Sequence, residues 1–541
     1  MAKYATDLPE LRQHIAPHLD LVTLKACSLV CRAWRLDFHS VLWERFSYKV
    51  PRSCTESLEE HVAWLDITSK KAHLFRHIYH KEYRRAIDPG VRDILLDRCH
   101  GLITIEAFVA GIRILDPVRY WEETLRPLIE QNKASLRRLQ LLSPCSWIPM
   151  TTLPLPNLLA GLPRLQSLEL GMASTLQGLL PILDACSTSL ECLDLRSNLR
   201  RRIKDTDQQN SLSQPLHQAT TTTPPRLKHL GIHGACYDGT LGDILSHLAI
   251  HSLESLLVND IIDNQLSVQA PPTLRDTLSR LTELDIKGLR PNHASAFLVL
   301  LGATPPHQLR KVRLGTMDTE CAAMLIQQQY QSLESLVVNF LWGHTGALAD
   351  ILATCSKLKH LDFEPFVDIR TLVDSRRPWV CTELEVFEGY FGLSPYENDD
   401  AGRSRHKDEE DDKVTASDPV TLDQVESLFM QRLGQLTKLR RLGQSYNIMG
   451  YFFDNDMGSD NMTWTLSSGL THLADLVNLQ WLEFVDGNLP TGIGIPELLF
   501  MKHHWHSLQG LACYNMDITE VEEWLAAEWP QLKVKLRHTI E

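Results

Sequence analysis

The sequence has no long hydrophobic run and no excess of basic residues. Its longest apolar stretches, such as residues 297–301, are far shorter than the roughly 20 residues that a membrane-spanning helix needs. The N-terminus lacks the paired basic and apolar regions of a signal peptide. The formal net charge of -13 argues against a general nucleic-acid-binding protein, because phosphate recognition draws on an excess of Lys and Arg. We therefore expect a soluble, unsecreted protein of the cytoplasm, the nucleus or both, with no membrane or nucleic-acid partner.

Sequence motifs typical of enzymes and metal sites are also missing. The twelve cysteines form no Cys-x-x-Cys pair, which favours reduced thiols over a disulfide framework. There is no glycine-rich phosphate loop, Gly-x-Ser-x-Gly elbow or His-Glu-x-x-His helix. His503, His504 and His506 come nearest to a metal cluster, but adjacent histidines do not converge on one ion without further ligands. We therefore expect a protein that is not an enzyme and holds no metal or other cofactor.

The sequence does contain a recurring pattern, Leu-x-x-Leu-x-apolar. Nine consecutive copies are separated by 24 to 37 residues, and most of these spacings fall in the range of leucine-rich repeats. The nine copies begin at Leu136, Leu165, Leu190, Leu227, Leu253, Leu281, Leu309, Leu333 and Leu358. Weaker copies begin at Leu384, Leu439, Leu479 and Leu508, and an earlier one begins at Leu102. We expect about thirteen or more repeats on this count.

The segments between these strands show helical spacing of apolar residues. The pattern i, i+3, i+4, i+7 occurs at Leu179, Ile182, Leu183 and Cys186, and again at Leu348, Ile351, Leu352 and Cys355. This spacing places four apolar groups on one helix face, which can close over the strand of the same repeat. The predicted fold is therefore α/β: a leucine-rich-repeat solenoid, or horseshoe, of parallel β-strands and outer helices.

Two insertions interrupt the repeats. Residues 395–420 are acidic and poor in apolar side chains, which indicates a solvated insertion; a regulatory role is the alternative. Residues 200–225 are rich in Thr, Gln, Ser and Pro and account for the spacing of 37.

Part of the pattern resembles the cysteine-containing type of leucine-rich repeat. Cys355-Ser-Lys-Leu358 and Cys99-His-Gly-Leu102 place a cysteine shortly before the strand leucine, as that family does. The sequence departs from the family in lacking a regular Asn or Cys after each strand, and only Asn198 stands where the motif would have it.

The N-terminus carries a second pattern. It combines an opening Leu-Pro at residues 8–9, a Leu-Val-Cys-Arg-x-Trp segment at residues 29–34 and a closing Leu-Trp at residues 42–43. This combination resembles an F-box, which is a small all-α module. The resemblance implies docking to the Skp-type adaptor of cullin-based ubiquitin ligases through positions matching Leu8, Pro9, Ile15, Leu19, Leu24, Val30, Trp34, Leu42 and Trp43.

The predicted organisation is an F-box-like module at 1–50, a helical junction at 51–100 and the solenoid at 101–541. In the solenoid, residues that flank the buried strand leucines should face the concave surface. The candidate substrate-binding residues are Asp194, Arg196, Glu283, Asp285, Lys311, Arg313, His360, Asp362, Trp481 and Glu483. Trp481 is the best single anchor, since tryptophan is enriched at binding hot spots.

The resemblance implies the substrate-recognition subunit of an SCF-type E3 ubiquitin ligase, with a protein substrate on the repeats. The alternative is an interaction scaffold without ubiquitin transfer, in which the F-box-like helices pack within the chain.

Overall fold

The computed structural model describes most of the chain in separate stretches. The described residues are 12, 15–47, 58–80, 88–108, 117–142, 155–172, 182–186, 188–197, 226–236, 241, 245, 252–261, 272–287, 294–339, 346–374, 377–393, 422–443, 462, 464–484, 493–514 and 519–537. The chain divides into unit 1, Met1–Asn259, and unit 2, Asp260–Glu541.

Unit 1 begins with helices and continues as alternating strands and helices. Its elements are η2 (Ala16–His18), α2 (Leu21–Val30), α3 (Arg32–Glu44), β1 (Arg45–Ser47), α5 (Leu58–Lys71), η3 (Ala72–Leu74), β2 (His77–His80), α6 (Pro89–Arg98), β3 (Thr104–Phe108), α7 (Pro117–Tyr120), η4 (Trp121–Leu125), α8 (Arg126–Gln131), β4 (Arg138–Leu142), α9 (Leu155–Ala160), β5 (Ser167–Met172), β6 (Cys192–Ser197), β7 (His229–Cys236) and β8 (Ser255–Ile261). From β1 to β7, each strand pairs in parallel with the next one in the sequence.

Unit 2 repeats the same arrangement. Its elements are α12 (Pro272–Thr277), β9 (Glu283–Ile286), α13 (Ala294–Ala303), β10 (Lys311–Leu314), α14 (Thr319–Gln329), β11 (Ser335–Val338), α15 (Gly346–Leu352), β12 (His360–Asp368), α16 (Ile369–Asp374), β13 (Val386–Gly392), α17 (Leu422–Gly434), β14 (Arg441–Gly443), η11 (Leu470–Leu473), β15 (Trp481–Phe484), α18 (Ile495–His504), β16 (Gly510–Tyr514), α19 (Thr519–Glu528) and β17 (Lys533–Arg537). Its strands also pair in parallel and in sequence order.

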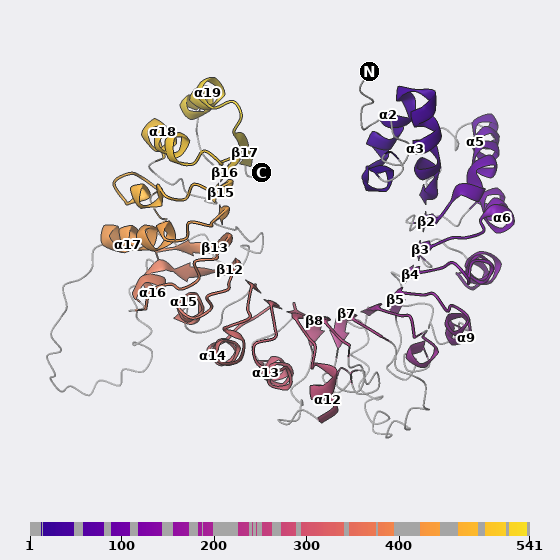
Figure 1. The fold of residues 1–541 in the computed structure, drawn as a ribbon, viewed down its shortest axis with the longest axis horizontal. Coiled ribbons are helices and arrows are strands. Elements are labelled where there is room, and N and C mark those ends of the chain that lie inside the picture. Colours follow the sequence, from indigo (N-terminus) through magenta and orange to yellow (C-terminus); the bar gives the residue numbers. More distant parts are fainter. Residues whose placement is uncertain are drawn as a thin grey trace, which may run out of the picture. The chain divides into compact units, whose positions relative to one another are not determined.

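The strand register stacks one buried apolar residue of each repeat on that of the next. In unit 1 this ladder is Ile78, Ile105, Leu139, Leu168, Leu193 and Leu230. In unit 2 it is Leu284, Val312, Leu336, Leu361, Phe387, Leu442, Leu482, Leu511 and Val534. Nearly all of these side chains are buried, and in both units the helices cover only one face of the strands (Figure 1). The predicted α/β leucine-rich-repeat solenoid is therefore confirmed.

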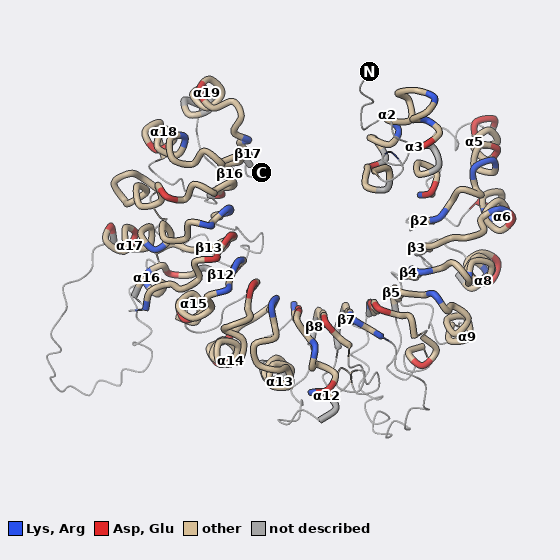
Figure 2. Tube along the Cα trace, in the orientation of Figure 1, with Lys and Arg blue, Asp and Glu red and all other residues tan. Residues whose placement is uncertain are grey.

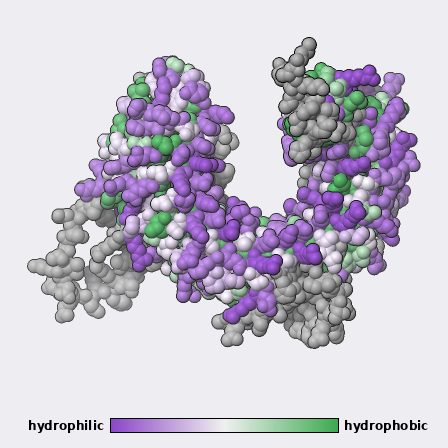
Figure 3. Space-filling model, in the orientation of Figure 1, coloured by the Kyte–Doolittle hydropathy of each residue, from purple (hydrophilic) through white to green (hydrophobic). Residues whose placement is uncertain are grey.

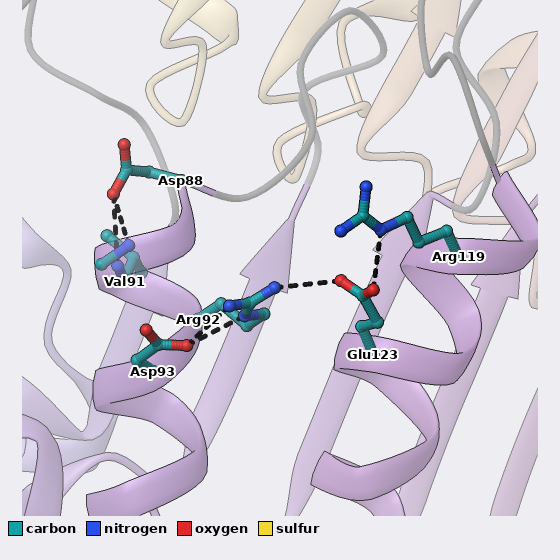
Figure 4. A network of polar contacts seen from close by, with 7 residues as sticks. Asp88, Val91, Arg92, Asp93, Arg119 and Glu123 are labelled. Atoms are coloured by element: carbon teal, nitrogen blue, oxygen red, sulfur yellow. Dashed lines mark hydrogen bonds and ion pairs between the residues drawn. The ribbon is translucent and has the colours of Figure 1, made fainter.

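Ion pairs connect neighbouring helices on the outer side of unit 1. The Asp88 carboxylate caps α6 by accepting hydrogen bonds from the backbone N–H groups of Gly90 and Val91, at 2.8 and 3.4 Å. Arg92 on α6 reaches Glu123 on η4 at 3.1 Å, and Arg119 on α7 reaches the same carboxylate at 2.7 Å (Figure 4). Exposed pairs of this kind contribute about 0–1 kcal/mol each, so the buried apolar ladder accounts for most of the stability.

Strands also occur where the sequence shows no clear repeat. The segment expected as a helical junction, residues 51–100, contains α5, η3 and α6, but it also contains β2, which pairs with β1 and β3. Here Phe75, Ile78 and His80 take the buried positions that leucines hold elsewhere, and all three are at most 2% exposed. Strand pairing therefore starts before residue 101.

Several predictions fall outside the described residues. They concern Leu8, Pro9, Leu179 and Asn198 and the insertions at 200–225 and 395–420. Among the residues that the structure does describe, the helices are all too short or too polar to span a bilayer.

Candidate functional site

Two short helices at the N-terminus form a small core of their own. The Asp20 carboxylate caps α2 by accepting a hydrogen bond from the Thr23 N–H at 2.7 Å. Ala16, Leu24 and Phe38 are buried between the helices. Arg12 pairs with Asp37 on α3 at 2.6 Å, so the chain before α2 is also held to this pair. Of the described side chains on α2 and α3, those of Leu24, Ser28 and Phe38 are buried, so few residues fix the two helices from inside.

That remaining surface is unusually apolar. Val22, Leu29 and Val30 on α2 are 79%, 67% and 62% exposed, and Leu36 on α3 is 71% exposed. On α2 the spacing of Val22, Leu29 and Val30 puts their side chains on one helix face. Figure 3 shows hydrophobic residues at the surface around these helices. We call the three residues of α2 the apolar stripe; Leu36 is a separate exposed residue on α3.

The nine residues that the F-box resemblance assigns to adaptor docking are placed in different surroundings. Ile15 and Val30 are exposed, at 46% and 62%. Leu24 is only 3% exposed and shapes the helix pair from inside instead of offering surface. Three more pack partly buried against the same core, namely Leu19, Trp34 and Leu42. Trp43 stacks on Phe75 at 6.5 Å, while Leu8 and Pro9 lie outside the described residues.

The helix pair is joined directly to the first strands. Helix α3 continues into β1, and the Arg76 N–H donates to the Glu44 carbonyl at 2.8 Å. Phe46 of β1 stacks on Phe75 at 4.5 Å between ring centres. These contacts fix the orientation of α3 on the first strands of unit 1.

Lys, Arg, Asp and Glu residues of both signs recur along the strands (Figure 2). The ten candidate substrate-binding residues all flank buried apolar residues of their strands, so the structure places them on the open face, which the helices leave uncovered. They are Asp194 and Arg196 in unit 1, and Glu283, Asp285, Lys311, Arg313, His360, Asp362, Trp481 and Glu483 in unit 2. Their placement follows from the period-two alternation of a strand.

Most of these charges already have a partner on the next strand. Arg196 reaches Glu169 at 2.6 Å, and Lys311 reaches Glu283 at 2.6 Å. Arg313 lies 4.0 Å from Asp285, with both on neighbouring strands of unit 2. A charged ligand would therefore exchange existing ion pairs for new ones, which favours specificity over raw affinity.

One cluster on unit 2 keeps its acidic groups poorly solvated. Burial raises the pKa of Asp362 above its usual value, although His360 and nearby arginines act in the opposite direction. Burial likewise raises the pKa of Glu388, whose carboxylate lies 2.7 Å from Arg441. Burial lowers the pKa of His360, because it disfavours the charged imidazolium, and the nearby Arg441 and Arg313 lower it further. Because Arg441 already pairs with Glu388, a further cationic group would mainly stabilise the ionised form of Asp362.

Trp481 lies at a different part of the same unit. Its indole N–H donates to the Glu483 carboxylate at 3.3 Å, and its ring lies over Gly510 of the next strand. A Cβ at position 510 would collide with that ring. The glycine therefore allows a half-buried aromatic surface to form on the open face.

Two of the three clustered histidines, His503 and His504, end α18, and His506 follows the helix. His503 and His504 meet edge to face at 4.8 Å between ring centres, and the buried Trp505 indole N–H donates to the Leu473 carbonyl at 2.9 Å. Trp505 thus anchors the helix end in the core.

Comparisons with known proteins give structural likeness without sequence likeness. No family model and no curated protein matches the sequence. Among solved structures, the chain is similar to the crystal structure of the Rad7 and Elc1 complex in yeast, with a TM-score of 0.39, 14% identity, and coverage of 91% of this chain and 98% of that one. It is also similar to the TLR13–ssRNA13 complex, with a TM-score of 0.34, 12% identity, and coverage of 83% and 51%. Because both TM-scores are below 0.5, the assignment of the class, a leucine-rich-repeat solenoid, rests on the repeat geometry described above.

Proposed function

We propose that this protein is the substrate-recognition subunit of a cullin-based, SCF-type E3 ubiquitin ligase. In this proposal the N-terminal helices dock a Skp-type adaptor, and the open strand faces hold a protein substrate. The protein catalyses nothing itself. Its contribution is proximity, because it raises the effective concentration of a substrate lysine near a charged conjugating enzyme.

The observation that carries this proposal is the apolar stripe. Val22, Leu29 and Val30 are each more than 60% exposed on α2, in a helix pair whose own core is small. Covering a Val or Leu side chain contributes about 1.5–3 kcal/mol, so a partner gains most by burying this surface. The stripe lies in the segment that resembles an F-box.

Adaptor binding tests the proposal directly. The double variant Leu29→Glu, Val30→Glu places two charges in the stripe without touching the buried core, so the fold should survive. We expect its affinity for a purified Skp-type adaptor, measured by calorimetry, to fall at least about a hundredfold. The matched control is Val477→Glu, Leu499→Glu, which changes the same residue types at sites in unit 2 that are 52% and 51% exposed.

Two negative outcomes of this binding experiment would lead to different conclusions. Equal affinities of both double variants would mean that the stripe is not the docking surface. A wild-type chain that does not bind the adaptor would exclude the ligase function and favour the interaction scaffold, in which the F-box-like helices pack within the chain.

A further inference from the structure

The open face of unit 1 holds four side chains of metal-ligating type. Cys192 and Asp194 lie on β6, and His229 and His233 lie on β7. The Asp194 Oδ1 atom is 3.3 Å from His229 Nε2 and 3.4 Å from His233 Nε2. The other carboxylate oxygen of Asp194 is 3.6 Å from Cys192 Sγ. We call these four side chains the β6–β7 cluster.

The register of the two strands explains how the cluster forms. Cys192 pairs with His229, and Asp194 pairs with Gly231. A Cβ at position 231 would collide with Asp194 Oδ1. Because this position is glycine, the carboxylate can lean across β7 and lie between the two imidazoles.

We propose that the β6–β7 cluster binds one zinc ion. Thiolate, imidazole and carboxylate are the ligands that zinc takes in proteins, usually four in a tetrahedron. Bonds of about 2.0–2.3 Å in a tetrahedron separate neighbouring ligand atoms by roughly 3.3–3.8 Å. The ligand atoms of Cys192, Asp194 and His229 all lie within 4.8 Å of one another, so these three form the core of the site. His233 Nε2 is 3.4 Å from Asp194 Oδ1 but lies outside this group of three, and the 3.6 Å contact of Cys192 uses the other Asp194 oxygen. A four-coordinate zinc site therefore requires His233 to move toward the other ligands.

The neighbouring strand β8 supplies a matching second layer of contacts. His229 Nδ1 lies 3.1 Å from Ser255 Oγ, and His233 Nδ1 lies 3.2 Å from Asn259 Nδ2. A histidine that binds metal through Nε2 carries its proton on Nδ1, which then donates to an outer acceptor. Ser255 Oγ can accept such a bond. Asn259 Oδ1, a buried atom without a hydrogen-bond partner, would accept the other after the amide rotates by half a turn.

Without metal, burial and the neighbouring side chains set the protonation of the cluster. Burial alone would raise the pKa of Asp194, but hydrogen bonds and charge from His229 and His233 outweigh it and hold the pKa well below its usual range. Burial and the nearby Asp194 carboxylate raise the pKa of the Cys192 thiol to about 11. Zinc binding should therefore release the thiol proton as the thiolate forms.

A second group of potential ligands in unit 2 is less suitable. His360, Asp362 and Glu388 also lie within 4.8 Å of one another through their ligand atoms, but Arg441 approaches Glu388 at 2.7 Å and already neutralises it. In unit 1 the corresponding cation, Arg196, is turned to Glu169 and leaves Asp194 to the histidines. Only the β6–β7 cluster, of these two, offers a sulfur ligand.

A zinc ion in this position would connect two strands that are far apart in the sequence. The spacing from Leu190 to Leu227 is 37 residues, the longest among the nine consecutive repeats. Long connections cost entropy when their ends are brought together, and a metal ion that joins the ends offsets this cost. The ion would thus hold the register of β6 and β7 across the insertion.

Metal content and cobalt spectroscopy of the full-length protein test this inference without adaptor or substrate. After dialysis against zinc and then buffer, we expect about one zinc per chain by mass spectrometry. Replacement by cobalt should give a thiolate-to-cobalt charge-transfer band. Cys192→Ser should remove that band, and Gly231→Ala, which keeps all four ligands but displaces Asp194, should weaken zinc binding at least about tenfold. Cys186→Ser, a thiol of the same unit outside the cluster, is the matched control and should behave like the wild type.

Three results would overturn the inference. They are less than about a tenth of a zinc ion per wild-type chain, a cobalt complex without the charge-transfer band, and equal zinc affinity in the wild type and the Cys192→Ser variant. Circular dichroism of each variant shows whether the strands remain folded. None of these measurements depends on the proposed ligase function, so each proposal can fail alone.

Discussion

Asn132 joins two neighbouring repeats of unit 1, and its replacement by alanine tests how the stacked repeats are held together. Its side-chain oxygen accepts hydrogen bonds from the backbone N–H groups of Gly101 and Leu102, at 2.7 and 2.8 Å. Its amide donates to the Leu128 carbonyl at 2.8 Å. Asn132 is only 2% exposed, so water cannot easily replace these bonds.

The magnitude follows from the three bonds. Each typical hydrogen bond contributes about 1 kcal/mol to stability, and an unpaired buried N–H adds a penalty of about 1–3 kcal/mol. The N–H of Leu102, which is fully buried, would be left without a partner. We expect Asn132→Ala to lower the free energy of unfolding by about 3 kcal/mol.

The assay compares Asn132→Ala with Asn478→Ala. Asn478 also bonds one backbone carbonyl, that of Thr437 at 2.9 Å, but it is exposed, so its removal should cost only about 0.5 kcal/mol. Urea denaturation followed by circular dichroism gives the two losses. Hydrogen exchange should also become faster at the Gly101 and Leu102 amides. Equal losses for the two variants, with unchanged exchange at these amides, would refute the reasoning.

Three further predictions concern the N-terminal helices and the open face of unit 2. Leu24→Ala should destabilise α2 by about 2–4 kcal/mol, whereas Val22→Ala should change its stability by less than about 0.5 kcal/mol, as hydrogen exchange of the α2 amides would show. Because the folded pKa of Asp362 is raised, the stability of the wild type should fall as pH rises through that pKa; Asp362→Asn should therefore melt higher than the wild type near pH 7 and equally below about pH 3. Gly510→Ala should displace the Trp481 ring into water and red-shift its fluorescence, and an unchanged spectrum would count against the packing described here.

The repeat class could be predicted from the sequence because its signal is redundant. Each strand contributes leucines at fixed offsets, and copies such as Leu168 and Leu193 become aligned neighbours in the structure. Any one copy could be coincidental, but period and alternation together specify strand, buried face and order. The same alternation predicted which residues lie on the open face.

The sequence did not reveal the polar residues that connect the repeats. Asn132 lies four residues before Leu136, and Gln329 lies four residues before Leu333. Gln329 accepts hydrogen bonds from the Gln308 and Leu309 N–H groups of the preceding repeat at 2.9 and 3.0 Å, just as Asn132 accepts from Gly101 and Leu102. The offset is a usable signal, but the two residue types differ, so a search for one repeated letter misses it.

Strands β1 and β2 were missed for another reason. Their buried positions are filled by Phe46, Phe75, Ile78 and His80, which satisfy the geometry of the repeat without its leucines. His80 can occupy a buried position because its Nδ1 atom forms a hydrogen bond with the Tyr120 hydroxyl at 3.0 Å. Tyr120 lies on α7, so only the folded arrangement of strand and helix shows that a polar residue is satisfied at this position.

Functional groups on the open face depend on the residue opposite them. Asp194 reaches two histidines because position 231 is glycine, and Trp481 lies flat because position 510 is glycine. In both pairs the glycine and the side chain that it admits are about thirty residues or more apart in sequence. Sequence alternation therefore identifies the exposed residues of each strand one at a time, whereas the chemistry of the face arises between strands. Substituting Gly231 or Gly510 should therefore alter binding, although neither change removes a ligand or contact residue. Such a result would show that the open face depends on which residues lie opposite each other on neighbouring strands, and not on individual side chains alone.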